Sequence, residues 1–386
     1  MLLQSPFPPD IRVEREINSL FENGFKIGIL CNQYIKNNSP KFPNCEIFRI
    51  NALFSNTILN KILNFPLFIN PRFVIKIFQI YWKFKPDFIH AHDLPMVPLA
   101  LLIKKFFKKP VVFDVHESYP EALIFFKKKG FVNFLFKNPK LAKILEKYCL
   151  KKSDILIVVV EEHKQKLIDQ NVSENKIFVV SNTVDLKTFC IQNPKTSIKE
   201  KYYDKFIFLY TGIVSNERGL EVPIKAIPII KKVLHNVLFM IVGEGPAKND
   251  LIKFVNILNI NDNVEFFSWP GHSKIADYMY SANVCIIPQP SNDFINSGVP
   301  NKLFEYMSQG KTVLVSDAKP MSRIILETNS GKVFKSNDEY DFAKKLIEIS
   351  NKNFDYGKNG RKAVEEKYNW NNDANVLVNL YYSLIN

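Results

Sequence analysis

The sequence predicts an α/β protein made of two doubly wound domains that face each other across a cleft. Short β-branched apolar runs alternate with amphipathic helical stretches along the whole chain. Most of these runs are apolar throughout, as expected for parallel strands that are covered on both faces. The length of 386 residues exceeds one comfortable core and favours two or three domains.

The N-terminal half begins with a helical pattern in which Val13, Ile17, Leu20 and Phe21 share one face. The segment 1–3 before it is too short for a normal first strand, so we expect a clipped strand or a start further upstream. The candidate strands of this half are Lys26–Cys31, Glu46–Ile50, Asp87–His90, Val111–Val115, Ile155–Val160 and Lys176–Val180.

A second series of strands follows after a polar stretch without clear periodicity, 185–203, which we interpret as a linker. Its candidate strands are Phe206–Tyr210, Leu238–Val242, Val264–Phe267, Val284–Ile287 and Thr312–Ser316. A helix over 372–384 ends the chain. The predicted division is a first domain over 1–185, a linker over 186–203, a second domain over 204–367 and a terminal segment over 368–386.

The composition indicates a basic globular protein, with 52 Lys+Arg against 38 Asp+Glu, a net charge of +14 and a pI of about 9.3. Such a charge favours anionic partners: nucleic acid, anionic lipid or phosphorylated substrates. The five cysteines are widely spaced, which argues against a disulfide framework and favours a reducing compartment. Prolines interrupt the N-terminal apolar run and no window is long enough to span a membrane, so we expect a cytoplasmic protein without a signal peptide.

The stretch 299–317 is the most informative part of the sequence. Pro300–Gln309 reads as a helix that starts with proline and stops at Gly310. Asn301 and Lys302 lie in its first turn, and Glu305 follows one turn later on the same face. A cation with free backbone N–H groups suits a diphosphate, and a carboxylate suits a diol, so this helix predicts a nucleotide-sugar site. The alternative is an ordinary amphipathic helix with its apolar residues inward: Leu303, Phe304 and Met307.

Two glycine-containing strand exits in the second half are further candidates. Gly212 follows one strand, and Arg218 precedes the next helix, where a guanidinium can bind phosphate oxygens. Gly243 and Glu244 follow the next strand, but the third glycine of a dinucleotide fingerprint is missing. The alternatives are a solvated arginine and glycines that only make turns.

In the first half, polar residues follow two apolar strands. His116 and Glu117 come directly after Val111–Val115, where a neutral imidazole could bind a sugar hydroxyl or relay a proton. The alternative is a histidine satisfied by its own turn. His90, His92 and Asp93 end the preceding strand, but a metal site needs further ligands and no other cluster supplies them. We therefore expect no metal.

Several motifs occur in a fixed order along the chain: Pro8-Pro9-Asp10-Ile11-Arg12-Val13, His90-Ala91-His92-Asp93, Asp114-Val115-His116-Glu117, Asn182-Thr183-Val184-Asp185, Thr211-Gly212 with Arg218-Gly219, Gly243-Glu244-Gly245-Pro246, and Pro300-Asn301-Lys302-Leu303-Phe304-Glu305. That order resembles the family 4 glycosyltransferases, the retaining group 1 enzymes of the GT-B fold. The resemblance spans nearly the whole chain. It implies two Rossmann-like domains, with a C-terminal helix crossing back to the first. It also implies a nucleotide-diphosphate sugar as co-substrate, and no metal or other cofactor.

The resemblance assigns roles to individual residues. Glu305 matches the glutamate that grips the ribose hydroxyls, Arg218 a diphosphate-binding cation, and His116 the histidine near the C6 hydroxyl of the transferred sugar. The implied catalytic residues are His116, Arg218, Lys302 and Glu305. The implied donor-binding residues are Gly212, Arg218, Gly243, Glu244, Asn301, Lys302, Leu303 and Glu305. The implied acceptor-side residues are Asp10, Arg12, His92 and Glu117.

The sequence departs from the family pattern at three places. Ser297 stands where the first glutamate of a pair is usual, and Ile213 stands where a basic residue often follows the first glycine of the second domain. The usual N-terminal glycine-rich turn is replaced by the proline-containing segment 8–12.

The expected function is retaining hexosyl transfer to a hydroxyl of a glycan or lipid-linked acceptor, in the synthesis of cell-envelope polysaccharide such as capsule, lipopolysaccharide or exopolysaccharide. Lysines and phenylalanines interleave over 104–152, which suits an anionic membrane surface, so we expect peripheral attachment to the inner face of the plasma membrane. The alternative is a lysine-rich solvated face. The alternative functions are a basic nucleic-acid-binding protein, for which we see no recognition motif, and a sugar-nucleotide epimerase of the same architecture.

Overall fold

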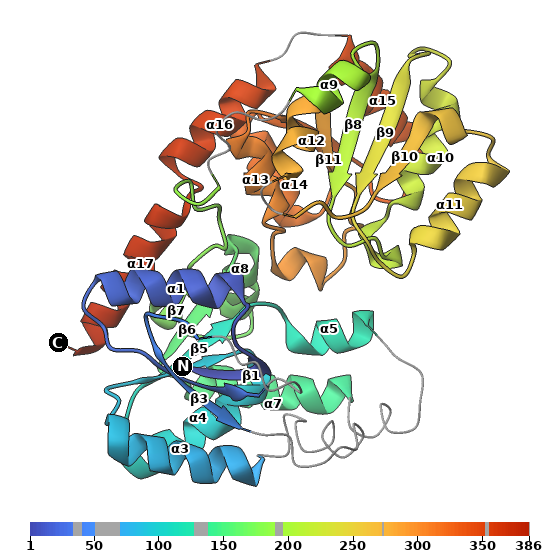
Figure 1. Cartoon of the computed structure of the whole chain (residues 1–386). Coiled ribbons are helices and arrows are strands. Elements are labelled where there is room, and N and C mark those ends of the chain that lie inside the picture. Colours follow the sequence, from blue (N-terminus) through green and yellow to red (C-terminus); the bar gives the residue numbers. More distant parts are fainter. Residues whose placement is uncertain are drawn as a thin grey trace. The chain divides into compact units, whose positions relative to one another are not determined.

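The computed structural model of the chain divides into two compact units. Unit 1 comprises Met1–Ser181 and Asp373–Asn386, and unit 2 comprises Asn182–Asn372. The structure describes residues 1–33, 41–50, 70–126, 138–189, 196–271, 274–351 and 355–385. Each unit contains a parallel sheet with helices packed on it, so the predicted doubly wound α/β class is confirmed (Figure 1).

The described strands of unit 1 form a seven-stranded parallel sheet in the order β3-β2-β1-β4-β5-β6-β7. They are β1 (Leu2–Pro6), β2 (Gly28–Asn32), β3 (Glu46–Ile50), β4 (Ile89–His92), β5 (Val111–Val115), β6 (Ile155–Val158) and β7 (Ile177–Val179). The order reverses between β1 and β4. In open parallel sheets this switch point is where ligands bind, beyond the carboxyl ends of the strands.

The short N-terminal strand is longer than the sequence suggested. The structure extends β1 through Pro6 and pairs it with both β2 and β4. Leu2 and Leu3 are only 3% and 2% exposed. The expectation that this strand is too short was therefore wrong, because five residues are enough for a central strand whose neighbours cover both of its edges.

The described helices of unit 1 are α1 (Ile11–Glu22), α3 (Pro71–Phe84), α4 (Val97–Phe107), α5 (Tyr119–Phe125), α7 (Pro139–Lys152) and α8 (Glu161–Asp169), with short 3-10 turns η1 (Leu94–Met96) and η2 (Glu174–Lys176). The last helix, α17 (Trp370–Ile385), joins this unit from Asp373 onward. Its Tyr381 packs edge-on against Phe25 and Phe88. The predicted return of the C-terminal helix to the first domain is therefore confirmed.

The described strands of unit 2 form a six-stranded parallel sheet in the order β10-β9-β8-β11-β12-β13. They are β8 (Phe206–Thr211), β9 (Val237–Val242), β10 (Val264–Phe267), β11 (Val284–Ile287), β12 (Thr312–Ser316) and β13 (Gly331–Phe334). Strand β13 was not predicted from the sequence, because this edge strand has only four residues, begins with glycine and includes a lysine. The switch point lies between β8 and β11, the strands that precede the Gly212 loop and Pro288.

The helices of unit 2 are α9 (Ser197–Lys201), α10 (Glu221–Ile230), α11 (Lys248–Ile257), α12 (Ile275–Ser281), α13 (Lys302–Ser308), α14 (Lys319–Thr328), α15 (Glu339–Ser350) and α16 (Tyr356–Glu366), with 3-10 turns η3 (Asn216–Arg218), η4 (Asn261–Asn263) and η5 (Ile295–Ser297). The described part of the proposed linker belongs to this unit and includes α9. The helix expected from Pro300 begins instead at Lys302, after a tighter turn in which Leu303 N–H donates to the Pro300 carbonyl at 3.0 Å.

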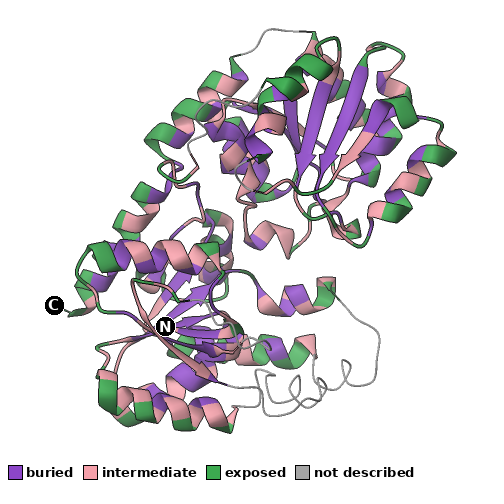
Figure 2. Cartoon of the chain, viewed as in Figure 1, coloured by how far each residue is buried: buried purple, intermediate pink, exposed green. Residues whose placement is uncertain are grey.

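Strands fill the interior of both units, while the helices turn their outer faces to solvent (Figure 2). The two faces of the unit 2 sheet carry separate apolar clusters, one of them against α10 and α15 and the other against α13 and α14. Within the described ranges, no helix has both the length and the apolar character needed to cross a bilayer.

Candidate functional site

In unit 2, the loops after β8 and β9 touch each other through their backbones. A Cβ on Gly243 would lie 1.8 Å from the Gly212 carbonyl oxygen, so only glycine fits there. Gly212 has a φ of 124°, a conformation that side chains disfavour. The ladder continues past the strand ends, with Val214 N–H bonded to the Glu244 carbonyl at 2.9 Å. The glycines therefore hold the two loops at the carboxyl edge of the sheet.

Helix α13 holds the end of β8 with two side chains. Lys302 Nζ donates to the Thr211 carbonyl at 2.6 Å and lies 4.0 Å from the centre of the Tyr210 ring. Tyr306 Oη accepts from the Thr211 N–H at 2.9 Å. A Cβ on Gly212 would come within 2.9 Å of Lys302 Nζ. The ammonium group therefore lies directly beneath the loop where a ligand of this switch point would bind.

The charge on Lys302 is poorly compensated in the part of the chain that the structure describes, where no carboxylate lies within ion-pair distance of it. Burial and the Arg218 guanidinium lower the pKa of Lys302 to about 7, while Glu305 acts in the opposite direction. Lys302, Arg218 and Glu305 are thus close enough to act on one another electrostatically, while their roles in binding a donor stay a prediction. Two cations beside each other favour an anionic ligand.

The other predicted donor-binding residues differ in whether their side chains are available to a ligand. Leu303 is 0% exposed and packs in the core, so only its backbone is available to a ligand. Glu244 is exposed, and its carboxylate pairs with Lys248 at 2.9 Å. Asn301 precedes α13 without a capping side-chain hydrogen bond. Ser297, where the resemblance led us to expect a glutamate, is buried and donates to the Phe294 carbonyl at 2.7 Å.

The predicted contribution of the helix N-terminus is smaller than expected. The helix spans only the seven residues Lys302–Ser308, so its dipole is short. Arg218 and the protonated form of Lys302 supply positive charge that does not depend on this short helix.

In unit 1, a pocket of about 170 Å³ lies at the carboxyl edge of the sheet, between the loops that follow β1, β4 and β5. It is lined by all four predicted acceptor-side residues and by His116: Asp10, Arg12, His92, Glu117 and His116. Asp10 caps α1 and pairs with Arg12 at 3.2 Å. Burial raises the pKa of Asp10, but Arg12 outweighs it and the pKa is lowered. The structure therefore gathers the unit 1 candidates into one polar pocket.

His116 lies between two carboxylates. Its Nε2 is 2.5 Å from Asp114 Oδ2, and its Nδ1 is 3.4 Å from Asp93 Oδ2. Burial lowers the pKa of His116, but Asp114 and Asp93 outweigh it and raise the pKa well above its usual value. The expected neutral imidazole is therefore wrong, because an imidazolium flanked by carboxylates donates hydrogen bonds and cannot take up a proton.

The structure also changes the argument about metal ligands. Four side chains place possible ligand atoms within 4.8 Å of one another: Glu16, His92, Asp114 and His116. The expectation that no further ligands lie near His92 was therefore wrong. Asp114 Oδ2 lies 3.0 Å from His92 Nδ1 and 2.5 Å from His116 Nε2, which are hydrogen-bond distances between the ligand atoms themselves. Metal independence stays a prediction.

Sequence reasoning assigned no role to two members of this cluster, Glu16 and Asp114. Glu16 follows Val13 and precedes Ile17 on the buried face of α1, and an acid on an apolar helix face was the signal that could have found it. Burial raises the pKa of Glu16 well above its usual value, and the charge of Asp114 raises it further.

Two family models match this chain and together span most of it. The model of the glycosyl transferases group 1 matches residues 192–370, and that of glycosyltransferase family 4 matches residues 17–188. The chain belongs to the group 1, family 4 glycosyltransferases, and its fold is GT-B.

Known relatives are distant. An uncharacterized glycosyltransferase of Methanocaldococcus jannaschii is 28% identical over 65% of this chain and 60% of its own length. A second one from that organism is 22% identical over 63% of this chain and 62% of its own length. The chain thus spans less than two thirds of these curated relatives.

Solved structures share the fold over nearly the whole chain. HepE of Anabaena, in complex with UDP, has a TM-score of 0.72 at 14% identity and covers 99% of this chain and 98% of its own. WaaG, a glycosyltransferase involved in lipopolysaccharide biosynthesis, has a TM-score of 0.68 at 14% identity and covers 97% of both chains.

Proposed function

We propose that the protein transfers a hexose, with retention of configuration, from a nucleoside-diphosphate sugar to a hydroxyl of a glycan or lipid-linked acceptor. The observation that carries this proposal is the group of Lys302, Arg218 and Glu305 beside the Gly212 loop. The negative charge of a diphosphate neutralises these two cations. The carboxylate of Glu305 accepts hydrogen bonds from the ribose hydroxyls.

The chemistry follows from leaving-group stabilisation. When the bond between the sugar and the diphosphate breaks, negative charge develops on the phosphate oxygens, where Lys302 and Arg218 stabilise it. The acceptor hydroxyl attacks from the side on which the diphosphate departs and passes its proton to the departing phosphate oxygen, which gives retention without a carboxylate nucleophile. The Nε2–H of His116 faces Asp114, so the Nδ1–H, which lies 3.4 Å from Asp93 and makes no hydrogen bond within the described residues, donates to a hydroxyl of the transferred sugar. The positive charge of His116 is unsuited to the role of general base.

The donor and the pathway are proposed from solved structures that share the fold. Because HepE binds UDP in its solved complex, UDP-sugars are the first donors to test. Involvement of WaaG in lipopolysaccharide biosynthesis supports an acceptor of the cell envelope. No metal is required in this proposal, since protein cations neutralise the diphosphate.

One helix of the basic region supports membrane attachment. On α7, the apolar side chains Leu141, Ile144 and Tyr148 are 40%, 67% and 55% exposed. The lysines of the same helix are Lys140, Lys143, Lys147, Lys151 and Lys152. Exposed apolar side chains among lysines suit the surface of an anionic bilayer. The part of the predicted surface over 127–137 lies outside the described residues.

The function is tested by turnover. The protein is incubated with UDP-, GDP-, ADP- and dTDP-sugars, with and without EDTA, and release of nucleoside diphosphate and the anomeric configuration of the product are measured. We expect one donor to be consumed with retention and without dependence on a metal. Epimerised sugar nucleotide without transfer would indicate the epimerase instead, and no reaction with any donor on any glycan or lipid-linked acceptor would contradict the proposal.

Membrane attachment is tested by flotation with vesicles that contain phosphatidylglycerol. We expect flotation at low salt and loss of flotation at high salt, and an Ile144→Glu variant should float less than the wild type. No flotation of the wild type at either salt concentration would contradict a membrane role for α7.

A further inference from the structure

Unit 1 contains a second polar pocket beside the one that holds His116. It has a volume of about 280 Å³ and lies between the start of α5 and the helices α7 and α8. We call it the α7–α8 pocket. Charged side chains form much of its wall: Glu121, Lys143, Glu146, Lys147 and Lys166. Such a wall suits a hydrophilic ligand that makes hydrogen bonds and ion pairs.

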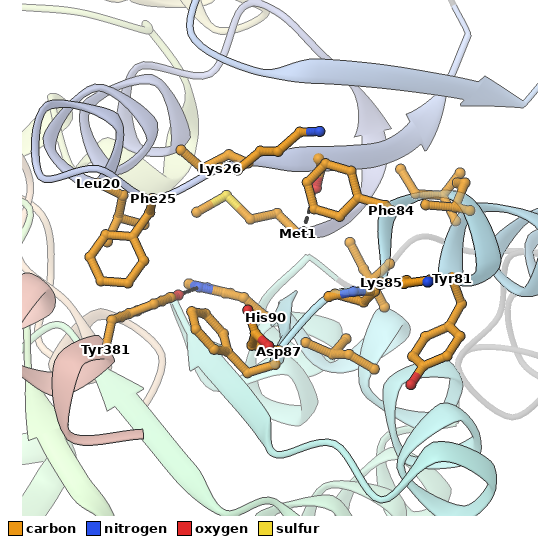
Figure 3. Close-up of a pocket in the computed structure, with 18 of the residues that line it drawn as sticks. Met1, Leu20, Phe25, Lys26, Tyr81, Phe84, Lys85, Asp87, His90 and Tyr381 are labelled. Carbon is orange, nitrogen blue, oxygen red and sulfur yellow. Dashed lines mark hydrogen bonds between the residues drawn. The ribbon is translucent and has the colours of Figure 1, made fainter. Parts of the chain in front are cut away.

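The chemistry of this pocket differs from that of a cavity at the opposite edge of the sheet. That cavity, of about 460 Å³, lies where β2 and β4 begin and has Phe25 and Phe84 among its walls (Figure 3). The Tyr381 hydroxyl also lines it but is hydrogen-bonded to His90 Nδ1 (Figure 3). Aromatic walls at the edge remote from His116 do not suit a hydrophilic acceptor, so the α7–α8 pocket is the better candidate for a sugar.

The two polar pockets of unit 1 share one segment of the chain, 117–120, which follows β5. Glu117 and Tyr119 line the pocket that holds His116, whereas Ser118 and Pro120 line the α7–α8 pocket. Successive side chains of this segment thus belong alternately to the two pockets. The α7–α8 pocket is therefore within reach of an acceptor that has several sugar units and occupies the pocket beside His116.

Three lysines give the α7–α8 pocket an excess of positive charge. Within the described ranges, none of Lys143, Lys147 and Lys166 has a carboxylate at ion-pair distance. Lys164, which precedes Lys166 on α8 and does not line the pocket, differs because it pairs with Glu174 at 3.1 Å. Uncompensated cations that line one pocket favour an anionic ligand.

Glu146 adds a hydrogen-bonding group that lacks a partner. Its Oε1 is buried and makes no hydrogen bond in the part of the chain that the structure describes. Burial raises the pKa of Glu146 to about 7, against the opposing effects of the Tyr119 N–H and of Lys166. A buried polar atom without a protein partner is normally satisfied by water or by a ligand, and a sugar hydroxyl supplies the donor that a carboxyl oxygen requires.

We infer that the α7–α8 pocket is a second acceptor subsite, which binds a sugar unit that carries a carboxylate or phosphate group. Lys143, Lys147 and Lys166 hold the anionic group, and Glu146 accepts a hydrogen bond from a hydroxyl of the same sugar. The pocket beside His116 then holds the unit whose hydroxyl attacks the donor. This inference rests on the proposed function for the identity of the ligand as part of an acceptor glycan, but its binding test needs no turnover.

The first test is a ligand-observed NMR titration of the whole protein, without nucleotide, at pH 7 and low salt. The probes are glucuronic acid, glucose 6-phosphate, glucose and inorganic phosphate. We expect both anionic sugars to bind about tenfold more tightly than glucose and than inorganic phosphate, because the subsite recognises charge and hydroxyls together. Equal binding of glucuronic acid and glucose, or of glucose 6-phosphate and inorganic phosphate, would overturn the inference.

The second test locates the bound glucuronic acid with a charge substitution. Lys166→Gln should weaken its binding about fivefold, the size of a partly exposed ion pair. The matched control is Lys164→Gln, which removes the same charge from the same helix outside the pocket and should bind glucuronic acid as the wild type does. Equal losses in the two variants would overturn the inference. So would binding that is lost in Arg12→Gln or Arg218→Ala and kept in Lys166→Gln, since the probe would then lie in another site.

The role of Glu146 is tested by comparing two neutral replacements. Glu146→Gln keeps a carbonyl oxygen as an acceptor, whereas Glu146→Leu does not, and thermal unfolding shows that each variant is folded. Glu146→Leu should bind glucuronic acid about fivefold more weakly than Glu146→Gln. Equal affinities of the two variants would show that Glu146 makes no hydrogen bond to the sugar and would overturn that part of the inference.

The third test is kinetic, with the donor that the turnover panel identifies and with acceptors that contain or lack a uronic acid or sugar phosphate. Lys166→Gln should raise KM for the anionic acceptor about fivefold and leave KM for the donor and for a neutral acceptor unchanged. Lys164→Gln should match the wild type. An unchanged KM for the anionic acceptor in Lys166→Gln would overturn the inference. If no donor is turned over, the proposed function fails while the binding titration still decides whether the pocket takes an anionic sugar.

Discussion

Replacing Lys302 by methionine should make the protein more stable and abolish nucleotide binding. The lowering of the lysine pKa from 10.5 to about 7 means that holding the charged form in the fold costs about 5 kcal/mol. Methionine has a similar length and removes this cost. It also loses the hydrogen bond to Thr211 and the contact with the Tyr210 ring, so we expect a net gain of about 1–2 kcal/mol at pH 6.

The stability difference between the two proteins depends on pH, because the pKa of Lys302 is lower in the folded than in the unfolded state. The cost is fully present below pH 7, where Lys302 is charged in both the folded and the unfolded state. It fades as the pH rises from 7 to 10.5, because the folded state loses its proton first. The free energy of unfolding of the variant should therefore exceed that of the wild type most at pH 6, and the difference should shrink toward pH 10.

The assay is thermal and chemical unfolding of both proteins at pH 6, 8 and 9.5, with and without UDP and GDP. A gain of 1 kcal/mol corresponds to about 2–4 °C in Tm for a domain of this size. The matched control is Lys311→Met, since Lys311 is also a half-buried lysine of unit 2 that donates to backbone carbonyls, those of Tyr280 and Ala282 at 2.9 Å. The control should keep its response to nucleotide. A Lys302→Met protein that is less stable than the wild type at pH 6, or that is still stabilised by the nucleotide, would refute the reasoning.

Three further substitutions test the remaining members of the two sites. Arg218→Ala should cut kcat about a hundredfold and raise the pKa of Lys302, so the pH at which nucleotide affinity declines should move upward. Calorimetric affinities from pH 6 to 9 check this. An unchanged midpoint of affinity against pH would show that Arg218 does not act on Lys302. Glu305→Gln should weaken binding of the ribonucleotide more than that of the 2′-deoxynucleotide, and equal losses for both would remove its ribose role. His116→Gln should lower kcat about tenfold to a hundredfold while nucleoside diphosphate binding is unchanged; a loss of UDP affinity equal to the loss of kcat would move His116 out of the sugar subsite.

Much of the fold could be predicted because the buried parallel strands are continuous apolar runs. The strands that precede His116 and Gly212 were recognised in this way, and with them the edges where the polar residues meet. The missed strands had no such signal: β13 is an edge strand of four residues, and β1 ends in proline. Their pairing depends on neighbours far along the chain.

The candidate sites could be predicted where polar residues lie at the carboxyl end of a recognisable strand. Asp10 and His116 follow β1 and β5, His92 ends β4, and all three line one pocket, as parallel topology requires. What the sequence could not show is charge state and long-range contact. The imidazolium of His116 depends on Asp93, which lies on another loop, and the partner of His90 is Tyr381, 291 residues away.

The most direct test of the account is a calorimetric titration of the whole wild-type protein with UDP, GDP, ADP and dTDP at pH 8, with EDTA, in two buffers of different ionisation enthalpy. At this pH most of the free Lys302 is neutral, so the account predicts that one diphosphate binds with uptake of up to one proton, and that Lys302→Met neither binds it nor takes up the proton. Binding of no nucleoside diphosphate, or binding that leaves the proton balance unchanged and persists in Lys302→Met, would contradict it.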